Sequence, residues 1–260
     1  MPPTAALSIA GSDPSGGAGI QADLKIFHQF GVYGEAAITL ITVQNTTTVS
    51  RVQVLPADLV LDQIAAVIED IPPAAAKTGA LGSAEMAQAV GRAAAAFRFP
   101  LVVDPVMVSK HGLPLLAPAA AAAMCDFLIP HATLVTPNIP EAEALTGIAI
   151  ESVEDMQRAA CRFRELGAKA VLIKGGHLEG DATDVLFDGS EWSEFRAPRI
   201  HTRHTHGTGC VYSAAITAGL ARGAALGDAI ARAKSFIQQA IRTAPELGRG
   251  SGPVNHWEVS

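Results

Sequence analysis

Residues 207–210, with the sequence Gly-Thr-Gly-Cys, stand directly before an alanine-rich segment, residues 211–222, that has the composition of a helix. Backbone N–H groups at a helix N-terminus, together with the positive end of the helix dipole, stabilise an anion or a developing negative charge. The same field lowers the pKa of a thiol, so we expect Cys210 to exist partly as thiolate and to act as a base or a nucleophile. Cys125 and Cys161 lie inside other predicted helices, and we interpret them as small buried apolar residues.

A second segment suited to ligand binding is the turn over residues 11–19, which carries four glycines in nine residues. Glycine has no Cβ, so this backbone can approach a ligand closely, although a purely structural turn remains an alternative. Residues 17–22 also match the dinucleotide pattern G-x-G-x-x-G/A, but Thr42 and Val43 stand where a Rossmann site needs an acidic residue. Lys77 is preceded by Ala76 rather than glycine, so any use of ATP does not depend on a Walker A loop.

Asn138 and Glu141 are three residues apart at the start of a predicted helix, and therefore lie on one face of it. Carboxylate and carbonyl oxygens suit Mg²⁺, which usually keeps several waters and shares phosphate oxygens. The alternative interpretation is structural: an Asn N-cap with a Glu that the helix dipole favours. Lys174, followed by two glycines after a predicted strand, is a cation compatible with phosphate.

Three histidines and a cysteine, all plausible zinc ligands, fall within ten residues at positions 201, 204, 206 and 210. Their spacing matches no zinc motif with a mechanical basis, and a strand would send neighbouring side chains to opposite faces. Zinc is therefore a disfavoured alternative.

The elements that must position these residues follow a regular pattern, because short apolar runs alternate with amphipathic segments along the whole chain. This alternation is typical of βαβ units and a mainly parallel sheet. The expected strands are residues 5–11, 36–43, 74–78, 101–104, 134–136 and 170–174. The expected helices are residues 20–30, 58–69, 83–97, 117–127, 152–166, 209–222 and 227–243. Residues 182–187 and 192–198 flank Asp-Gly-Ser, which predicts a closing antiparallel hairpin.

The fold class that we expect is α/β, a three-layer α/β/α sandwich with a mainly parallel sheet, helices on both faces and antiparallel edge strands. In such sheets ligands bind outside the carboxyl ends of the strands. Polar residues follow several expected strands in this chain, at positions 12–13, 44–45, 77–79, 104, 136–138 and 174–176. We therefore expect these residues to share one site.

Length and composition exclude several classes of protein. The chain has 260 residues, a formal net charge of −6 and 49% apolar residues, which fits one globular domain over residues 1–260 and argues against a nucleic-acid partner. No apolar run reaches the length of a membrane span, and the N-terminus lacks the basic region of a secretory signal. Three widely spaced cysteines suit a reducing compartment, so we expect a cytoplasmic protein without a membrane partner.

Taken together, these motifs resemble the ribokinase-like superfamily and, more narrowly, the hydroxymethylpyrimidine/phosphomethylpyrimidine kinases of thiamin biosynthesis. The resemblance runs from residues 10–23 through residues 136–141 and 174–177 to residues 204–210, and so covers nearly the whole chain. It implies a phosphotransferase that uses ATP and Mg²⁺ to convert 4-amino-5-hydroxymethyl-2-methylpyrimidine to its monophosphate and then to the diphosphate. It also implies a ribokinase-like domain and a homodimer, and it leaves open a need for a monovalent cation.

The resemblance implies a role for each matching catalytic position. Gly207, Thr208, Gly209 and Cys210 correspond to the anion hole for the transferring phosphoryl group, and Cys210 takes the place of the Asp base that is usual in the wider superfamily. Asn138, Glu141 and Asp104 correspond to residues around the metal. Lys174 corresponds to a phosphate contact, and Lys234 to a position near the nucleotide.

For the pyrimidine pocket, the resemblance points to Gln44, Ala18 and Asp23. The Gln44 carboxamide offers two donors and an acceptor, which match the ring nitrogen and exocyclic amine of an aminopyrimidine. Relatives that also accept pyridoxal carry Met at that position. Ala80 is a departure, because the family usually has a Met there that packs on the substrate ring, and Val106 or Met107 can fill the space left.

Other functions remain as alternatives. One is a pyridoxal/pyridoxine kinase of the same superfamily, which Gln44 disfavours and Ala80 keeps open. A second is a non-catalytic pyrimidine sensor that kept the fold and lost turnover, and a third is a thiol-dependent or zinc enzyme. Residues 108–112 have the composition of a polar, glycine-hinged lid.

Overall fold

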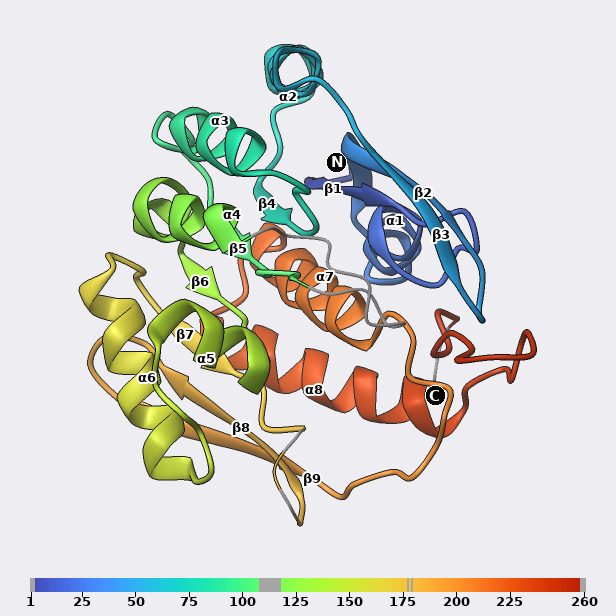
Figure 1. Ribbon diagram of the computed structural model, residues 1–260, viewed down its shortest axis with the longest axis vertical. Coiled ribbons are helices and arrows are strands. Elements are labelled where there is room, and N and C mark those ends of the chain that lie inside the picture. The colour runs from blue at the N-terminus through green and yellow to red at the C-terminus, as the bar shows by residue number, and fades with distance from the viewer. Residues whose placement is uncertain (1–2, 108–117, 177, 179, 258–260) are drawn as a thin grey trace.

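Figure 1 shows a computed structural model of the chain, which describes residues 3–107, 118–176, 178 and 180–257. Within these residues, nine strands form one sheet in the order β3-β2-β1-β4-β5-β6-β7-β8-β9. The strands are β1 (Ala5–Ser12), β2 (Tyr33–Gln44), β3 (Val49–Val54), β4 (Ala75–Thr78), β5 (Leu101–Val103), β6 (Leu134–Val135), β7 (Val171–Ile173), β8 (Ala182–Phe187) and β9 (Trp192–Ala197). The α-helices are α1 (Gly19–Gln29), α2 (Ala57–Asp70), α3 (Ala84–Ala94), α4 (Pro118–Ala123), α5 (Ile139–Thr146), α6 (Val153–Glu165), α7 (Thr208–Ala221) and α8 (Leu226–Arg242).

The centre of the sheet is parallel and its two edges are antiparallel. Strands β2, β1, β4, β5, β6 and β7 pair in parallel, whereas β3 pairs antiparallel with β2, and β8 and β9 extend the opposite edge antiparallel. This arrangement confirms the expected mainly parallel α/β sandwich, including the hairpin of β8 and β9.

Helices cover both faces of the sheet and bury the central strands. One apolar core lies between the sheet and α2, α3, α4, α5 and α6, and the other between the sheet and α1, α7 and α8 (Figure 1). Strand β1 supplies both cores, because Leu7 and Ile9 face the first while Ala6 faces the second. A strand that is buried on both faces reads as a continuous apolar run, which is why the alternating pattern of exposed strands is missing at residues 5–10.

Local capping explains where several helices begin. The Ser83 hydroxyl accepts the Met86 N–H at the start of α3, and Ser152 and Asp155 form a reciprocal capping box at the start of α6. Each bond satisfies a backbone group that has no partner within the helix. The expected helix starts near residues 83 and 152 are therefore confirmed.

Two parts of the secondary structure differ from expectation. No strand was expected at β3, whose sequence Val-Ser-Arg-Val-Gln-Val is half exposed and lies at the edge of the sheet, so it carries only a weak apolar signal. The helix expected over residues 117–127 is split into α4 and a π-helix, η1 (Met124–Leu128), which a 3-10 turn, η2 (Ile129–His131), follows. The segment expected to be a lid, residues 108–112, lies outside the described residues.

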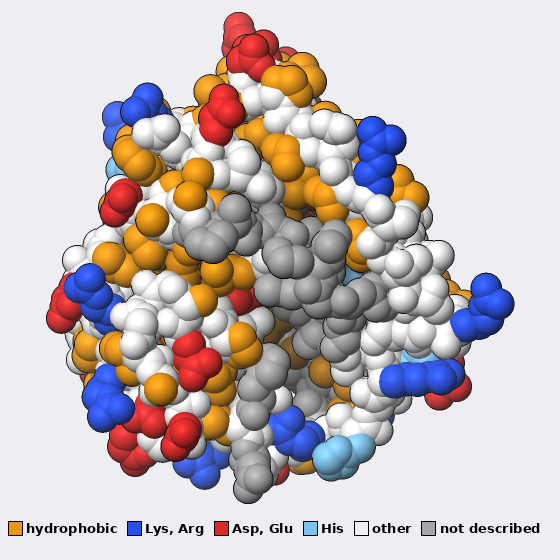
Figure 2. Space-filling view, in the orientation of Figure 1, with side chains coloured by type: hydrophobic (Ala, Val, Ile, Leu, Met, Phe, Trp, Pro, Cys, Tyr) orange, Lys and Arg blue, Asp and Glu red, His pale blue; other side chains and the backbone are white. Residues whose placement is uncertain are grey.

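The surface shown in Figure 2 mixes charges of both signs. Among the described residues of this face, Lys and Arg side chains are scattered among Asp and Glu, mainly toward the outline of the molecule. In the part of the chain that the structure describes, no helix has both the length and the apolar composition required to cross a membrane.

Candidate active site

A cavity of about 790 Å³ opens at the carboxyl ends of the parallel strands. Its walls come from the turn after β1, the end of β2, the segments after β4, β5 and β6, and the starts of α5 and α7. The expected site residues that line it are Ala18, Gln44, Ala80, Asp104, Val106, Met107, Asn138, Glu141, Lys174, Gly207, Thr208, Gly209, Cys210 and Lys234. The tertiary structure thus brings together side chains that are up to 216 positions apart in the sequence, from residue 18 to residue 234.

The glycine-rich turn lets two backbone segments approach each other at the bottom of this cavity. A Cβ at Gly19 would lie 2.2 Å from the Gly11 carbonyl oxygen, and a Cβ at Gly207 would lie 1.9 Å from the Gly17 carbonyl oxygen. Both glycines also have positive φ, 57° for Gly19 and 80° for Gly207. The turn after β1 therefore packs directly against the loop that begins α7.

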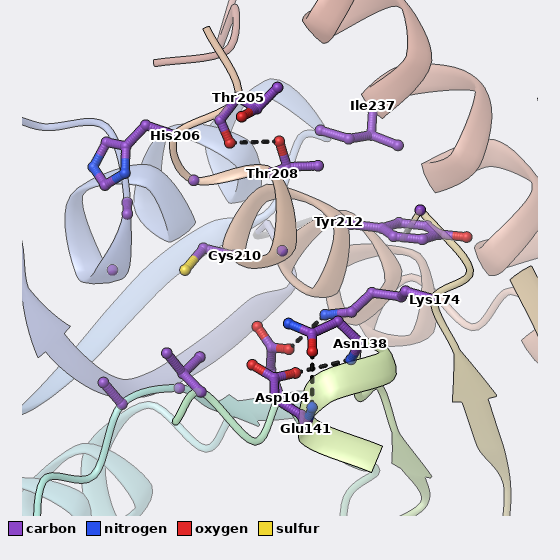
Figure 3. A pocket seen from close by; sticks show the side chains of 18 of the residues that line it. Asp104, Asn138, Glu141, Lys174, Thr205, His206, Thr208, Cys210, Tyr212 and Ile237 are labelled. Atoms are coloured by element: carbon purple, nitrogen blue, oxygen red, sulfur yellow. Dashed lines mark hydrogen bonds and ion pairs between the residues drawn. The ribbon is translucent and has the colours of Figure 1, made fainter. Parts of the chain in front are cut away.

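Helix α7 begins at this contact and directs its first turn into the cavity. Gly207 is the N-cap, and the Thr208 hydroxyl donates to the Thr205 carbonyl oxygen over 2.7 Å. The Cys210 side chain projects from this first turn toward the cavity (Figure 3). The Thr208 N–H donates to the Thr205 carbonyl oxygen at 3.3 Å, whereas the N–H groups of residues 209 and 210 have no partners within the helix and can bind the oxygens of an anion.

The expected thiolate at Cys210 is wrong for the ligand-free site. Burial raises the pKa of this thiol to about 12, and the nearby Lys77 charge offsets only part of that effect. Asp23 and Asp104 raise the pKa further. Desolvation and the two nearby carboxylates outweigh the Lys77 charge, so the Cys210 thiol, which is partly exposed in the cavity wall, is protonated at neutral pH.

Asp104 and Lys174 form an ion pair in the cavity wall near the start of α7. Lys174 Nζ lies 2.9 Å from Asp104 Oδ1 (Figure 3). Asp104 also accepts hydrogen bonds from the hydroxyls of Thr136 and Ser213. Burial alone would raise the pKa of Asp104, but the charges of Lys174 and Lys77 outweigh it and hold the pKa below its usual value. Asp104 is thus an anion, and Lys174 is a fixed cation.

Asn138 and Glu141 confirm the structural interpretation of their spacing and also line the cavity. They form a reciprocal capping box at the start of α5: Asn138 Oδ1 accepts the Glu141 N–H at 2.9 Å, and Glu141 Oε2 accepts the Asn138 N–H at 2.8 Å. They also line the cavity beside Asp104 and Lys174. Burial raises the pKa of Glu141 to about 7, and the Lys174 charge limits that rise.

This donor set fits a magnesium ion that keeps much of its water. Among the described residues, no group of three His, Cys, Asp or Glu side chains is placed to hold a metal ion by itself. Asp104 and Glu141 supply two carboxylates at the cavity wall, and Mg²⁺ typically takes its remaining ligands from water and phosphate oxygens. A buried carboxylate with a raised pKa, such as Glu141, would also be stabilised in its ionised form by a cation.

The zinc alternative finds no support in the same part of the chain. His204 and His206 are buried and have different partners: Arg203 Nε donates to His204, whereas His206 contacts Asp13. His201 is exposed.

The expected place of Asp23 in the pocket wall is wrong. Asp23 is fully buried, 2.8 Å from Lys77 Nζ and 2.6 Å from the Ser8 hydroxyl, and it is not among the residues that line the cavity. Its position on the inner face of α1 directs the side chain into the core between α1 and the sheet. A buried carboxylate in a chain with few charges needs a partner, and that partner is Lys77.

Two charge pairs at the cavity were not expected from the sequence. Asp13 and His206 form a buried pair 2.7 Å apart next to Gln44, and Asp184 in β8 holds Lys234 at 2.7 Å. Lys234 Nζ also donates to the Ala182 carbonyl oxygen. Sequence spacing carries no signal for these pairs, because their members are 193 and 50 positions apart.

Comparison with known proteins identifies the family. The profile of the family described as phosphomethylpyrimidine kinase matches residues 13–255. The hydroxymethylpyrimidine/phosphomethylpyrimidine kinase of Bacillus subtilis is 46% identical over 97% of this chain and 94% of its own length. The thiamine biosynthesis bifunctional protein ThiED of Geobacter sulfurreducens is 51% identical over 98% of this chain, which spans only 53% of that longer protein.

A solved structure agrees with this assignment at the level of fold. The ADP complex of a Bacillus subtilis pyridoxal kinase superimposes with a TM-score of 0.91, at 40% identity and 98% coverage of both chains. The match covers nearly the whole of both chains. With the profile match and the sequence identities, it establishes that the chain belongs to the phosphomethylpyrimidine kinase family, within the ribokinase-like fold.

Proposed function

We propose that this protein phosphorylates the hydroxymethyl group of 4-amino-5-hydroxymethyl-2-methylpyrimidine with ATP, and then phosphorylates the monophosphate to the diphosphate, as a step in thiamin biosynthesis. One observation carries the proposal: the first turn of α7, the Asp104–Lys174 pair and the Asn138–Glu141 capping box face a single cavity (Figure 3). Phosphoryl transfer needs mainly alignment of the reactants and neutralisation of charge, and this arrangement supplies both.

The anionic oxygens of the transferring group have two sources of stabilisation in the chain itself. Gly209 and Cys210 line the cavity at the start of α7, where their N–H groups have no partners within the helix. The Lys174 ammonium lies beside them, since a Cβ at Gly209 would be only 3.4 Å from Lys174 Nζ. Preorganised donors in a site with little water are worth several kcal/mol at a developing charge.

The metal role that we assign is to Asp104, Glu141 and Asn138. Bound Mg²⁺ would neutralise phosphate oxygens of the nucleotide. Asp104 and Glu141 would hold its water shell, while Asn138 keeps the Glu141 carboxylate in place through the capping box. We assign no site for a monovalent cation.

Cys210 and Gln44 have different roles toward the substrate: Cys210 accepts the proton of the hydroxyl group, and Gln44 binds the ring. In the first step the hydroxyl oxygen attacks the γ-phosphorus, ADP leaves, and the hydroxyl proton passes late to the Cys210 thiolate. In the second step the attacking oxygen belongs to an already anionic phosphate, so no base is required. Gln44, Ala18, Ala80, Val106 and Met107 form the wall that receives the ring.

A pyridoxal kinase activity is the second candidate, because the solved structure with a TM-score of 0.91 is described as a pyridoxal kinase. Ala80 lines the cavity without the bulk of Met, so its wall leaves room for a differently substituted ring. The sensor alternative is disfavoured because the residues to which we assign catalytic roles all line one cavity.

A coupled assay for ADP release tests the proposal. The protein and MgATP are supplied separately with the pyrimidine alcohol, its monophosphate and pyridoxal, and the products are identified by mass. Turnover of both pyrimidines with much slower use of pyridoxal supports the proposal. Preference for pyridoxal would replace it with the second candidate, and binding without turnover would favour a sensor.

The remaining expectations on organisation also stay proposals. We infer one domain over residues 1–260, since a single sheet carries both helical layers of the described residues. We also propose a cytoplasmic homodimer; light scattering during size-exclusion chromatography measures its mass.

A further inference from the structure

Gln44 and His206 contact each other at the cavity wall. The direction of the hydrogen bond between them depends on which ring nitrogen of His206 carries a proton. His206 Nε2 lies 2.7 Å from Asp13 Oδ2 and 3.2 Å from the Gln44 Nε2 position. Gln44 and His206 both line the cavity, and Asp13 and His206 are each only 4% exposed. A single ring nitrogen therefore faces a carboxylate and a carboxamide at once.

The surroundings of Asp13 identify it as an ionised acceptor. Its Oδ2 accepts the Ala18 backbone N–H at 3.0 Å and the Ser15 hydroxyl at 2.9 Å, and its Oδ1 accepts the Ser15 backbone N–H. Burial tends to raise the pKa of Asp13, but the hydrogen bonds from His206 and Ser15 outweigh it and lower the pKa. Because the 2.7 Å contact needs a donor, the proton lies on His206 Nε2.

A protonated His206 Nε2 has no lone pair left to accept a hydrogen bond from an amide NH₂ group. The oxygen and nitrogen of a carboxamide have similar shapes, and their hydrogen-bond partners distinguish them. Rotating the Gln44 amide by half a turn places Oε1 toward His206, where it shares the Nε2–H with Asp13. The NH₂ group then takes the other position, which has no protein partner among the described residues.

We propose that Asp13 and His206 are positioning residues that hold the Gln44 carboxamide with its oxygen toward His206 and its NH₂ group toward the cavity. This inference rests on the proposed function only for the identity of the substrate. It assigns Gln44 the role of a donor, so the ligand edge beside it must offer an acceptor with a lone pair in the ring plane. For the aminopyrimidine, that acceptor is the ring nitrogen N3 and not the adjacent exocyclic amine.

The protein holds His206 firmly enough for this role. The His206 N–H donates to the Gly252 carbonyl oxygen at 3.1 Å, and the His206 carbonyl oxygen accepts the Val254 N–H at 3.2 Å. The ring also packs against Gly17, where a Cβ would lie 2.5 Å from His206 Cδ2. Substitution of Gly17 by Ala therefore displaces the ring without removing it.

Nuclear magnetic resonance of the ligand-free protein tests the proton position without any use of activity. The protein is labelled with nitrogen-15, and the two ring nitrogens of His206 are assigned with the help of H206Q. The expected result is a protonated Nε2 at neutral pH, and a Gln44 NH₂ signal that shifts when the pyrimidine alcohol is added. A bare Nε2 with the proton on Nδ1 alone would overturn the proposal.

A second experiment measures recognition with two analogues of the pyrimidine alcohol. One analogue carries C–H in place of N3, and the other lacks the exocyclic amine. Loss of N3 leaves the Gln44 NH₂ group without a partner, so we expect kcat/KM of the wild-type protein to fall about 10- to 100-fold, mainly through KM. In H206L and G17A the amide is free to turn, and this penalty shrinks to less than about threefold.

The controls separate positioning from general damage. H28L makes the same chemical change on the exposed face of α1 and keeps the full N3 penalty. In a double-mutant cycle, H206L adds no further loss of discrimination to Q44L, because both changes act on the same contact. An unchanged N3 penalty in H206L overturns this inference while the kinase function stands. Absence of turnover of the parent alcohol by the wild-type protein, by contrast, refutes the proposed function, and the nuclear magnetic resonance result still decides the proton position.

Discussion

At the scale of single residues, Cys210 shows two opposing effects on one thiol. Its place in the first turn of α7 favours the thiolate, because the helix N-terminus carries partial positive charge. Burial, together with Asp23 and Asp104, favours the thiol and raises the pKa to about 12 despite Lys77. The second effect is larger, so the thiolate that we propose as the base for the first phosphoryl transfer is a minor species at neutral pH.

This ionisation predicts a difference between the two phosphorylation steps. Below a pKa of about 12, the thiolate fraction of Cys210 grows about tenfold per pH unit, so the chemical step on the alcohol should accelerate in that proportion between pH 7 and 9. In C210A we expect this rate to be about 10²- to 10⁴-fold lower and nearly independent of pH. Single-turnover measurements with the alcohol and the monophosphate check both expectations.

The expected burial of Cys161 is wrong, because this residue lies exposed on α6, and Cys125 is only partly buried. The control for this experiment is therefore C161A. It should leave both steps unchanged. Equal losses in the two steps of C210A would contradict the assignment of Cys210 as the base, because the monophosphate supplies its own anionic oxygen.

At the scale of an element, strand β2 carries a buried carboxylate that lacks a hydrogen-bond partner in the part of the chain that the structure describes. Gly34 faces α1, where a Cβ would lie 2.7 Å from Leu24, so the alternation of side chains directs Glu35 to the opposite face. Neither Glu35 carboxylate oxygen has a hydrogen-bond partner among the described residues, and the residue is 7% exposed. Burial raises the pKa of Glu35 to about 7.

This raised pKa predicts that E35Q stabilises the protein at alkaline pH. The folded state keeps the Glu35 proton up to about pH 7, whereas the unfolded chain loses it near 4.5. The contribution of Glu35 to stability is therefore fully present below about pH 4.5 and is lost as the pH rises through 7. At pH 8 we expect E35Q to be more stable than wild type by about 1–2 kcal/mol, a value reduced for partial access of water.

Chemical denaturation at pH 5 and pH 8 measures this difference. Substitution of the exposed Glu69 on α2 by Gln provides the matched control and should give the same difference at both pH values. A stability gain for E35Q that did not change with pH would show that packing, and not ionisation, was responsible.

At the scale of the whole molecule, one buried ion pair joins three elements beneath the cavity. Lys77 from β4 and Asp23 from α1 are 2.8 Å apart, and Ser8 from β1 donates to the same carboxylate oxygen. Both charged side chains are fully buried. Such a pair contributes little by itself, but removal of one partner leaves an uncompensated charge in the core.

We expect K77M to lower the free energy of unfolding by about 3–5 kcal/mol. The double variant D23N/K77M should recover most of that loss, because no buried charge is left unpaired and Asn can still accept the Ser8 hydrogen bond. Urea denaturation of the two variants and the wild type measures the effect. Two losses that simply add in the double variant would mean that the pair is not coupled in the core.

The elements around the site show which structural features the local sequence predicts. Residues 138–141 predict the start of a helix because Asn caps the backbone there, and the same pattern predicted the oxygen atoms that now face the cavity. Strand β3 and the π-helix η1 were not predicted, because an exposed edge strand has little apolar alternation and a π-turn has no composition of its own. In the described residues, the carboxyl ends of the parallel strands lie at one edge of the sheet, and the ligand site expected at that edge follows from the parallel topology.

The amino-acid sequence alone determined the α/β class, the order of most elements and the short motifs, because hydrophobic period, glycine turns and helix caps are local properties. The motifs at residues 11–19 and 207–210 also pointed to the family to which the chain belongs. Only the tertiary structure decided which charged side chains form ion pairs and which ionisable groups are desolvated. Asp23 lies in the core and not in the expected pocket wall, and the Cys210 thiol is protonated. The burial of Asp23 and the pKa of Cys210 both depend on neighbours that are distant in sequence. Desolvation and charge pairing are set by those three-dimensional neighbours, which no local pattern specifies.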